Sequence, residues 1–236
     1  MKNIATLLLL TILLTSCNGF SQKKSPSKEQ KEEVAEISDK DKNGLDISST
    51  LLAEIQSKTK KKILPLNREI WNYDRNGNED NYVIDEGIYF DFVDEITAHD
   101  IFNKYSKQVS SNGNYLFLTE MDFDDSYNTY YDVVILKCSS QFDLVKLVGT
   151  NGMNYDVYNQ DIIDKLTEWH NQVGFEIVVV DGARIHAYMK NLPTDINAFA
   201  EEVYEFCPDV IDQGYSSMEE MISDYQNNKY FWLWWD

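Results

Sequence analysis

The sequence predicts an α+β fold, a mixed sheet layered with helices, on three observations. Apolar side chains at helical spacing alternate along the chain with short apolar runs that are typical of strands. The dipeptide Asp181-Gly182 between two such runs is a strong hairpin signal. The last run, residues 230–235, carries aromatic or aliphatic side chains on both faces. We therefore expect it to be the last strand added to a sheet that is covered on two sides.

The first half of the globular part is predicted to combine short strands with two helices. The first helix is expected to begin at Thr97, which has a capping partner three residues on in Asp100. In chain order we expect strands at 63–66 and 82–92, a helix from 97, strands at 115–119 and 131–138 around an acidic loop at 122–125, and a helix over 140–148.

The second half has stronger local signals. In chain order we expect a loop at 150–155, a helix over 162–173 that ends at Gly174, strands at 175–180 and 183–190, a helix over 195–206, a last helix after Ser217, and the terminal strand. The strand at 183–190 alternates apolar and polar residues, so one of its faces is expected to be polar. With one strand added from residues 131–138, this half resembles a split βαβ (ferredoxin-like) arrangement.

A leader peptide is predicted for residues 1–16. Lys2 precedes an apolar run that is too short to span a bilayer, which is the layout of a secretory signal. The run ends in Leu14-Thr15-Ser16-Cys17, which resembles the cleavage box of bacterial lipoproteins. Cys17 is therefore expected to be acylated and to anchor the protein to a membrane of the cell envelope, in the periplasm or on the outer surface.

The domain organisation follows from composition. Residues 17–62 are rich in Ser, Lys, Glu, Gln and Asp and are predicted to form a disordered polar tether. Residues 63–236 are predicted to form a single globular domain. Cys138 and Cys207 end an apolar strand and an amphipathic helix, which favours two buried thiols over a disulfide. Their spacing does not match a zinc site.

The formal net charge of -19 at pH 7 limits the classes of partner. A strongly acidic chain repels phosphate backbones, so a nucleic-acid partner is not expected. The membrane, reached through the N-terminal lipid, and a protein are the partners that the sequence suggests. No phosphate-binding, dinucleotide or metalloprotease motif is present, and no cofactor is predicted.

Four stretches resemble the bacterial domain-of-unknown-function 4253 family. They are residues 149–155, 202–209, 212–214 and 233–236, which read GTNGMNY, EVYEFCPD, DQG and LWWD. The resemblance covers about residues 90–236 and implies a domain with these limits. Because the family is uncharacterised, the resemblance implies no reaction.

The first group of candidate binding residues lies on the polar side of the strand predicted for residues 183–190. His186 stands between Arg184 and Tyr188, where a hydrolase could place a general base. The alternative interpretation is a half-exposed strand face with a packing role.

The second group lies in two loops. Amides in the first loop could contact a ligand or only fix the loop, and carboxylates in the second could face a cleft or only cap a turn. These candidates are Asn151, Asn154, Tyr155, Asp209, Asp212 and Gln213.

Three functions remain open. The first is a non-catalytic protein- or ligand-binding module, including an immunity-like role against a basic toxin. The second is a hydrolase that uses His186 with Asp209 or Asp212. The third is a calcium or small-ligand binder that uses acidic loops such as residues 39–44, 74–80 and 122–125, although neither of the first two completes a calcium-loop pattern.

Overall fold

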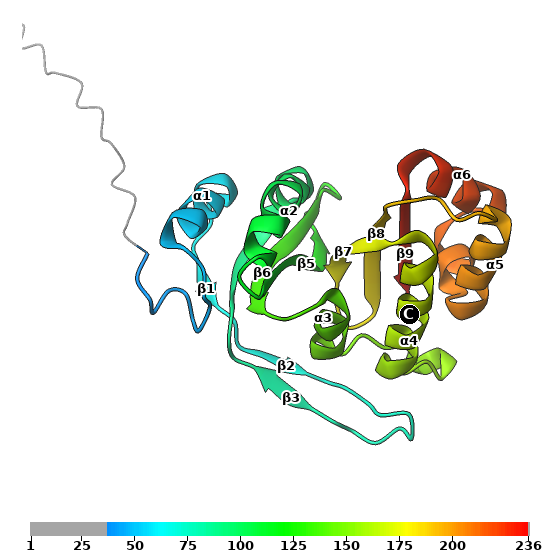
Figure 1. The fold of residues 1–236 in the computed structure, drawn as a ribbon, viewed down its shortest axis with the longest axis horizontal. Helices are drawn as coiled ribbons and strands as arrows, with labels where there is room; N and C mark the ends of the chain where they lie inside the picture. Colours follow the sequence, from blue (N-terminus) through cyan, green and yellow to red (C-terminus); the bar gives the residue numbers. More distant parts are fainter. Residues whose placement is uncertain (1–36, 236) are drawn as a thin grey trace, which may run out of the picture. The chain divides into compact units, whose positions relative to one another are not determined.

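A seven-stranded mixed sheet organises the chain in the computed structural model, which describes residues 37–235 (Figure 1). The strand order is β1-β4-β6-β5-β7-β8-β9, and a separate two-stranded hairpin joins β2 and β3. Neighbouring strands are antiparallel except for β5 and β7, which are parallel. Helices pack on the sheet, so the α+β prediction is confirmed.

The elements of the described range follow the predicted alternation. In chain order they are α1 (Ser49–Thr59), β1 (Leu64–Pro65), β2 (Arg68–Ile70), β3 (Tyr82–Ile84), β4 (Ile88–Asp94), α2 (Glu95–Ser110), β5 (Asn114–Phe123), β6 (Thr129–Lys137), α3 (Gln141–Val148), the 3-10 turn η1 (Met153–Tyr155), α4 (Asn159–Val173), β7 (Phe175–Val180), β8 (Arg184–Met189), α5 (Ile196–Phe206), the π-helical turn η2 (Val210–Gly214), α6 (Met218–Asn228) and β9 (Tyr230–Trp234).

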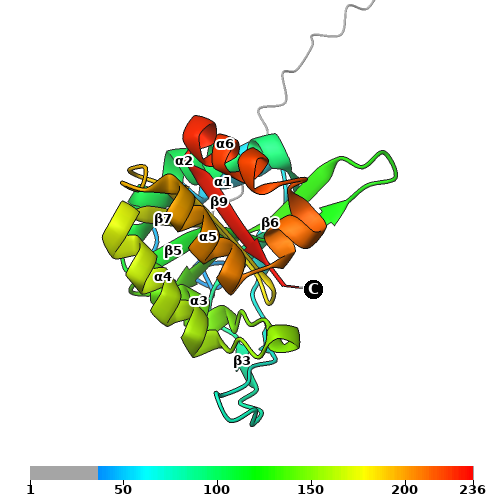
Figure 2. The same cartoon turned by 90° about the vertical axis from the view of Figure 1, so that its right-hand side faces the viewer.

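Each face of the sheet has its own apolar core. One core combines side chains from β5 to β9 with α3, α4, α5 and α6, and Trp169 lies at its centre, fully buried. Figure 2 shows α4, α5 and α6 lying over this side of β9. The second core combines β4, β5, β6 and β7 with α1 and α2. The sheet is therefore a middle layer, as the runs of apolar residues in its strands require.

The terminal aromatic segment is a strand, but its two faces are not equally covered. β9 lies at the edge of the sheet beside β8. Phe231 and Leu233 are buried, whereas Tyr230, Trp232 and Trp234 are only half-buried. The reason is that α1 and α2 lie over β4, β5 and β6 instead of over β8 and β9. This corrects the expectation of a strand covered on two sides.

The tether predicted for residues 17–62 is wrong for residues 37–62. These residues contain α1, whose Leu52 and Ile55 are fully buried in the second core. Ser48 caps the helix by accepting a hydrogen bond from the backbone N–H of Leu51 at 3.0 Å. Ile37, Leu45 and Ile47, which precede the helix, are buried in the same core, so these few apolar residues together dock the segment. The predicted leader, Cys17 and residues 17–36 lie outside the described residues.

The strand order differs from a split βαβ arrangement. From β6 to β9 the elements do follow the order strand, helices, hairpin, helices, strand. In space, however, β5 lies between β6 and β7, and β9 pairs with β8 at the edge. Two helices precede β9, so the chain can return beside β8 in the antiparallel sense.

The cap of α2 differs from the predicted one. Asp94, and not Thr97, caps α2, because its carboxylate accepts from the backbone N–H of Thr97 at 3.0 Å.

Cys138 and Cys207 are free and buried, which confirms the prediction of two buried thiols. Burial raises the pKa of Cys138 to about 11 and that of Cys207 to about 12. Within residues 37–235, no helix has the length and apolar character needed to cross a membrane.

Candidate functional site

The polar face of β8 lies beside the half-buried aromatic residues of β9. Alternation along β8 places Arg184, His186 and Tyr188 on this face, and the register sets them opposite Trp234, Trp232 and Tyr230. The three β8 residues predicted as candidates therefore do share one surface. Arg184 is held at the end of the strand, where its Nε donates to the carboxylate of Asp181 at 2.8 Å.

A pocket of about 530 Å³ opens where this surface meets the start of α2. Its wall consists of Glu95, Ile96, His99, Tyr188, Asn228 and Tyr230. The rings of Tyr188 and Tyr230 are paired with their centroids 5.0 Å apart. Of these residues only Tyr188 was among the sequence candidates. The others come from α2, α6 and β9, which no local pattern joins to β8.

One histidine, His99, lines the pocket, and a second, His186, lies against Tyr230 of its wall; the pKa of both is lowered. The phenolic O–H of Tyr230 lies 2.6 Å from Nδ1 of His186, and that of Tyr188 lies 3.4 Å from Nδ1 of His99. Burial lowers the pKa of His186 to about 3, with smaller contributions from Arg184 and His99. Burial also lowers the pKa of His99, although Glu95 opposes the shift.

The two tyrosines remain phenols over the physiological pH range. Burial is the main cause that raises the pKa of Tyr188 and of Tyr230, and the carboxylate of Glu95 adds to both shifts. The Tyr230 phenol can therefore donate to the neutral ring of His186. A general base near neutral pH needs a pKa near the working pH, so His186 is poorly suited to that role.

The loop candidates form a different cluster, centred on Asp209. Its side chain is buried and accepts hydrogen bonds from the phenol of Tyr155 at 2.5 Å and from the amide of Gln213 at 2.9 Å. Asp212 instead accepts from the phenol of Tyr204 at 3.4 Å. Three of the predicted residues are thus joined directly.

The two remaining loop candidates are the amides Asn151 and Asn154, and the contacts of Asn151 hold the backbone of the loop. The side-chain amide of Asn151 donates to the carbonyl of Gly149 at 3.0 Å, and its backbone N–H donates to Gly182 at 2.9 Å. These bonds fasten the loop to the hairpin between β7 and β8. Asn154 lies in η1 and is exposed. The structural role predicted for the amides therefore fits Asn151 best.

The Asp209 cluster is a clamp around the terminal tryptophans. Sγ of Cys207 lies 3.0 Å from the carbonyl oxygen of Trp234. A Cβ on Gly214 would lie 2.1 Å from the ring of Trp232, and one on Gly152 would lie 2.5 Å from the ring of Trp235. Both glycines are needed because a ring occupies the place of a side chain. The four sequence stretches 149–155, 202–209, 212–214 and 233–236 therefore meet around the end of β9.

The pairing proposed for a hydrolase is not seen in these contacts. His186 bonds to Tyr230 on the polar face of β8, whereas Asp209 and Asp212 bond to tyrosines of the clamp. A catalytic base also needs a partner within hydrogen-bond distance that orients it. Among residues 37–235, His186 has its hydrogen bond with Tyr230 and no contact with Asp209 or Asp212, and its pKa is too low for a base at neutral pH.

The acidic loops use their oxygens within themselves. Asp74 accepts from the backbone N–H groups of Asn76 at 2.8 Å and Asn78 at 2.9 Å, which is the bonding of an ordinary polar turn. Asp124 accepts from Ser126 and Asn128 in the same way. Over residues 37–235, no three His, Cys, Asp or Glu side chains gather as a metal site would require.

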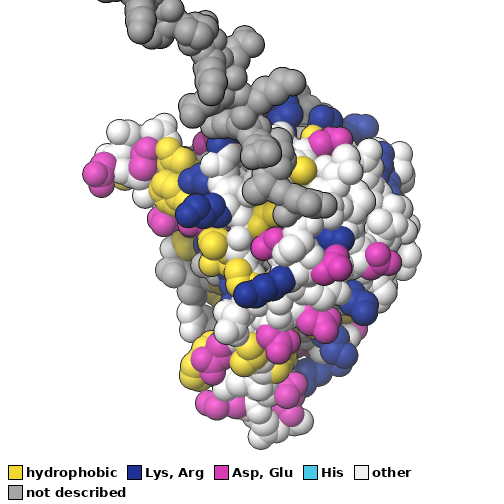
Figure 3. Space-filling model, turned by 90° about the vertical axis from the view of Figure 1, so that its left-hand side faces the viewer, with side chains coloured by type: hydrophobic (Ala, Val, Ile, Leu, Met, Phe, Trp, Pro, Cys, Tyr) yellow, Lys and Arg dark blue, Asp and Glu magenta, His cyan; other side chains and the backbone are white. Residues whose placement is uncertain are grey.

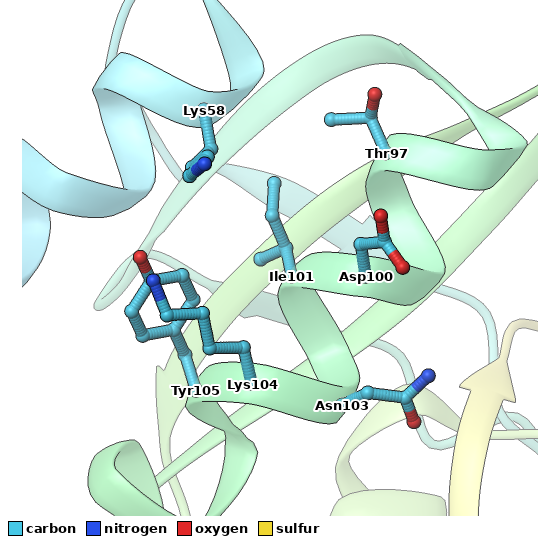
Figure 4. A pocket seen from close by; sticks show the side chains of 7 residues that line it. All are labelled: Lys58, Thr97, Asp100, Ile101, Asn103, Lys104 and Tyr105. Atoms are coloured by element: carbon cyan, nitrogen blue, oxygen red, sulfur yellow. The ribbon is translucent and has the colours of Figure 1, made fainter.

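A second pocket, of about 550 Å³, lies between α1 and α2 (Figure 4). Lys104 lies over the ring of Tyr105 with Nζ 4.7 Å from its centroid, while Asp100 and Asn103 point elsewhere. Its polar groups do not converge on one point. On the neighbouring face, acidic and basic side chains are interspersed (Figure 3). This side of the molecule has the character of an ordinary solvated surface.

Comparison with known proteins identifies the C-terminal part alone. No match was found among curated proteins or among solved structures. Residues 132–236, which begin within β6, match the family described as "Domain of unknown function (DUF4253)". The four motifs at residues 149–155, 202–209, 212–214 and 233–236 all fall within this match, so the resemblance to the DUF4253 family is confirmed for residues 132–236, whereas residues 90–131, to which it was also extended, lie outside the match.

Proposed function

We propose that the chain is a non-catalytic binding module whose pocket at the start of α2 receives a cationic side chain of a basic protein partner. The observation that carries the proposal is the ring pair of Tyr188 and Tyr230 beside the carboxylate of Glu95. Aromatic faces attract a cation through their quadrupole, and a carboxylate adds a direct charge.

The electrostatics of the pocket support a cationic guest. His99 and His186 have lowered pKa values and carry no charge at neutral pH, so they do not repel a cation. The formal net charge of -19 favours encounter with a basic partner and raises the rate of association. A basic toxin is one such partner, in which case the role is immunity-like.

A peptide of alternating lysine and glycine residues tests the proposal by calorimetric titration of the full chain. We expect measurable binding that weakens as salt is added, because screening reduces the attraction. Glu95→Gln should weaken binding by about threefold, and Tyr188→Ala by about fivefold through loss of the cation–π contact. Glu201→Gln, an exposed carboxylate on α5, is the matched control and should leave the affinity unchanged.

Two results would contradict the proposal. One is equal binding of a peptide in which glutamate replaces lysine. The other is an affinity that is the same for the native chain, Glu95→Gln and Tyr188→Ala.

The proposed module is held at a membrane by acylation of Cys17. The support is the motif alone, since Leu14-Thr15-Ser16-Cys17 follows a short apolar run. Growth with a fatty acid that carries a chemical tag should label the native chain and Cys138→Ser, but not Cys17→Ser. Label that persists in Cys17→Ser would contradict lipidation at this residue.

A further inference from the structure

Three aromatic rings line the pocket at the start of α2, and they are inclined to one another. The rings of Tyr188 and Tyr230 are tilted by 47°, with their centroids 5.0 Å apart. The ring of His99 stands at 79° to that of Tyr188, with centroids 6.4 Å apart. All three side chains are half-buried, so each keeps surface that a guest can reach. Rings at such angles surround a guest on more than one side, as they do in the aromatic cages that bind quaternary ammonium groups.

Hydrogen bonds hold the two phenols of the pocket in place. The O–H of Tyr230 lies 2.6 Å from Nδ1 of His186, and that of Tyr188 lies 3.4 Å from Nδ1 of His99. A phenol has a single proton, so a phenol that donates to its histidine has no second donor to turn toward a guest. The rings are therefore fixed before a guest arrives, which reduces the entropy lost on binding.

The wall of the pocket suits a guest with one positive charge. Among the described residues that line it, Glu95 is the only Asp, Glu, Lys or Arg. Asn228 is the last residue of α6, so the negative end of that helix's dipole lies at the wall. The start of α2 contributes the opposite partial charge, but the carboxylate of Asp94 caps it by accepting from the backbone N–H of Thr97 at 3.0 Å. The wall thus offers no cation that could pair with a negative group of the guest.

The same wall favours methyl groups over N–H donors. A primary ammonium has three N–H donors to satisfy, whereas side-chain oxygens outside the phenols come only from Glu95 and Asn228 among the lining residues. Ile96, which is 77% exposed, adds apolar surface instead. A trimethylammonium group has no N–H donor, and it is less strongly hydrated than the ammonium of lysine, so it loses less on leaving water.

The size of the pocket agrees with this chemistry. Its volume of about 530 Å³ lies within the range of roughly 300–1,000 Å³ that is typical of small-ligand sites. The pocket therefore has room for three methyl groups around a nitrogen and for the chain that carries them.

We propose that the pocket binds a trimethylammonium group, the chemistry shared by choline and Nε-trimethyl-lysine. The proposal rests on the cation-binding part of the proposed function and specifies which cation the pocket prefers. The nitrogen's charge faces Glu95, and the methyl groups lie against Ile96 and the rings of Tyr188 and Tyr230.

Calorimetric titration of the full chain compares choline with its neutral isostere, in which a carbon atom replaces the nitrogen. The two molecules have the same shape, but only choline is charged. We expect choline to bind about tenfold more tightly, because the isostere is attracted neither to the ring faces nor to Glu95. The lysine and glycine peptide described above should bind about fivefold more tightly when its lysines are trimethylated.

The two trimethylated probes also distinguish the source of the group. Choline that binds as tightly as the trimethylated peptide indicates a free small molecule. Tighter binding of the peptide indicates a methylated side chain of a protein partner.

The variant Tyr188→Leu keeps an apolar side chain in the wall and removes the ring. It should weaken choline binding by about fivefold, and it should bind the trimethylated and unmodified peptides almost equally. Tyr127→Leu is the matched control, because Tyr127 lies in the turn between β5 and β6 and is 88% exposed. It should leave both the choline affinity and the preference for the trimethylated peptide unchanged.

The outcomes separate this proposal from the proposed function. If the lysine peptide binds and its trimethylated form binds no more tightly, the proposed function is supported and the trimethylammonium proposal is overturned. If choline binds and the lysine peptide does not, the trimethylammonium proposal is supported and the basic protein partner is overturned. The trimethylammonium proposal is also overturned if neither trimethylated probe binds, if choline and its isostere bind equally, or if Tyr188→Leu keeps the native preference.

Discussion

At the scale of single residues, close contacts with tryptophan rings explain several of the sequence motifs. Gly214 and Gly152 lie against Trp232 and Trp235, and Asp209 joins the segments that carry them by accepting from Tyr155 and Gln213. The motif glycines leave room for the tryptophan rings, and Asp209 joins the segments that carry them. These residues hold the terminal strand in place, and this structural role explains them without catalysis.

Replacement of Gly214 by alanine tests this packing role. The added Cβ would lie 2.1 Å from the ring of Trp232, so the ring or the backbone must move. We expect Gly214→Ala to lower the free energy of unfolding by about 3 kcal/mol in denaturant titrations. Gly182→Ala is the matched control, because a Cβ there meets no atom within 4 Å, and it should cost less than about 0.5 kcal/mol. Equal effects of the two changes would contradict the clamp.

At the scale of elements, the place of α1 and of β9 in the fold, and not their local composition, determines how far each is buried. α1 comes from a polar stretch, yet Leu52 and Ile55 bury it in the second core. β9 comes from the most aromatic stretch, yet it is an edge strand with one half-buried face. The half-buried face is what leaves Tyr230 available to the pocket.

Truncation of Leu52 tests whether α1 belongs to the domain. The side chain is fully buried, so Leu52→Ala should leave a cavity and lower the free energy of unfolding by about 3 kcal/mol. Ser57→Ala, on the exposed side of the same helix, should change the free energy of unfolding by less than about 0.5 kcal/mol. If α1 were part of a tether, neither change would alter the unfolding midpoint.

At the scale of the whole molecule, two kinds of group make the fold sensitive to acid. His186 is neutral in the folded protein with a pKa of about 3, whereas an exposed histidine takes up a proton near its usual 6.5. Asp74 has a pKa of about 2 because the side chain and backbone of Asn78 donate to it. In both cases the unfolded chain binds a proton at a higher pH than the folded chain does. The free energy of unfolding therefore falls as the pH falls. The contribution of the neutral His186 is fully present above about pH 6.5.

The acid sensitivity of His186 can be isolated with His186→Asn, whose amide oxygen can still accept from Tyr230. Between pH 7 and pH 5, the unfolded native chain protonates this histidine and the folded chain does not. The native free energy of unfolding should therefore fall by about 2 kcal/mol more than that of the variant over this interval. Denaturant titrations at the two pH values measure the difference. Parallel losses in the two proteins would show that His186 is not kept neutral by the fold.

Local signals in the sequence were enough for the α+β class, the hairpin at Asp181-Gly182, the terminal strand and the DUF4253 motifs, because each depends on residues close together in the chain. They also placed Arg184, His186 and Tyr188 on one face, since alternation in a strand is a local property. The sequence could not show that α1 docks, because a few apolar residues stabilise a helix only when a partner surface exists. Likewise, Glu95 and Tyr230 meet at one pocket only because strand order and helix placement bring distant segments together. Tertiary packing alone decided this site, since contacts between residues far apart in the chain leave no period or spacing in the sequence.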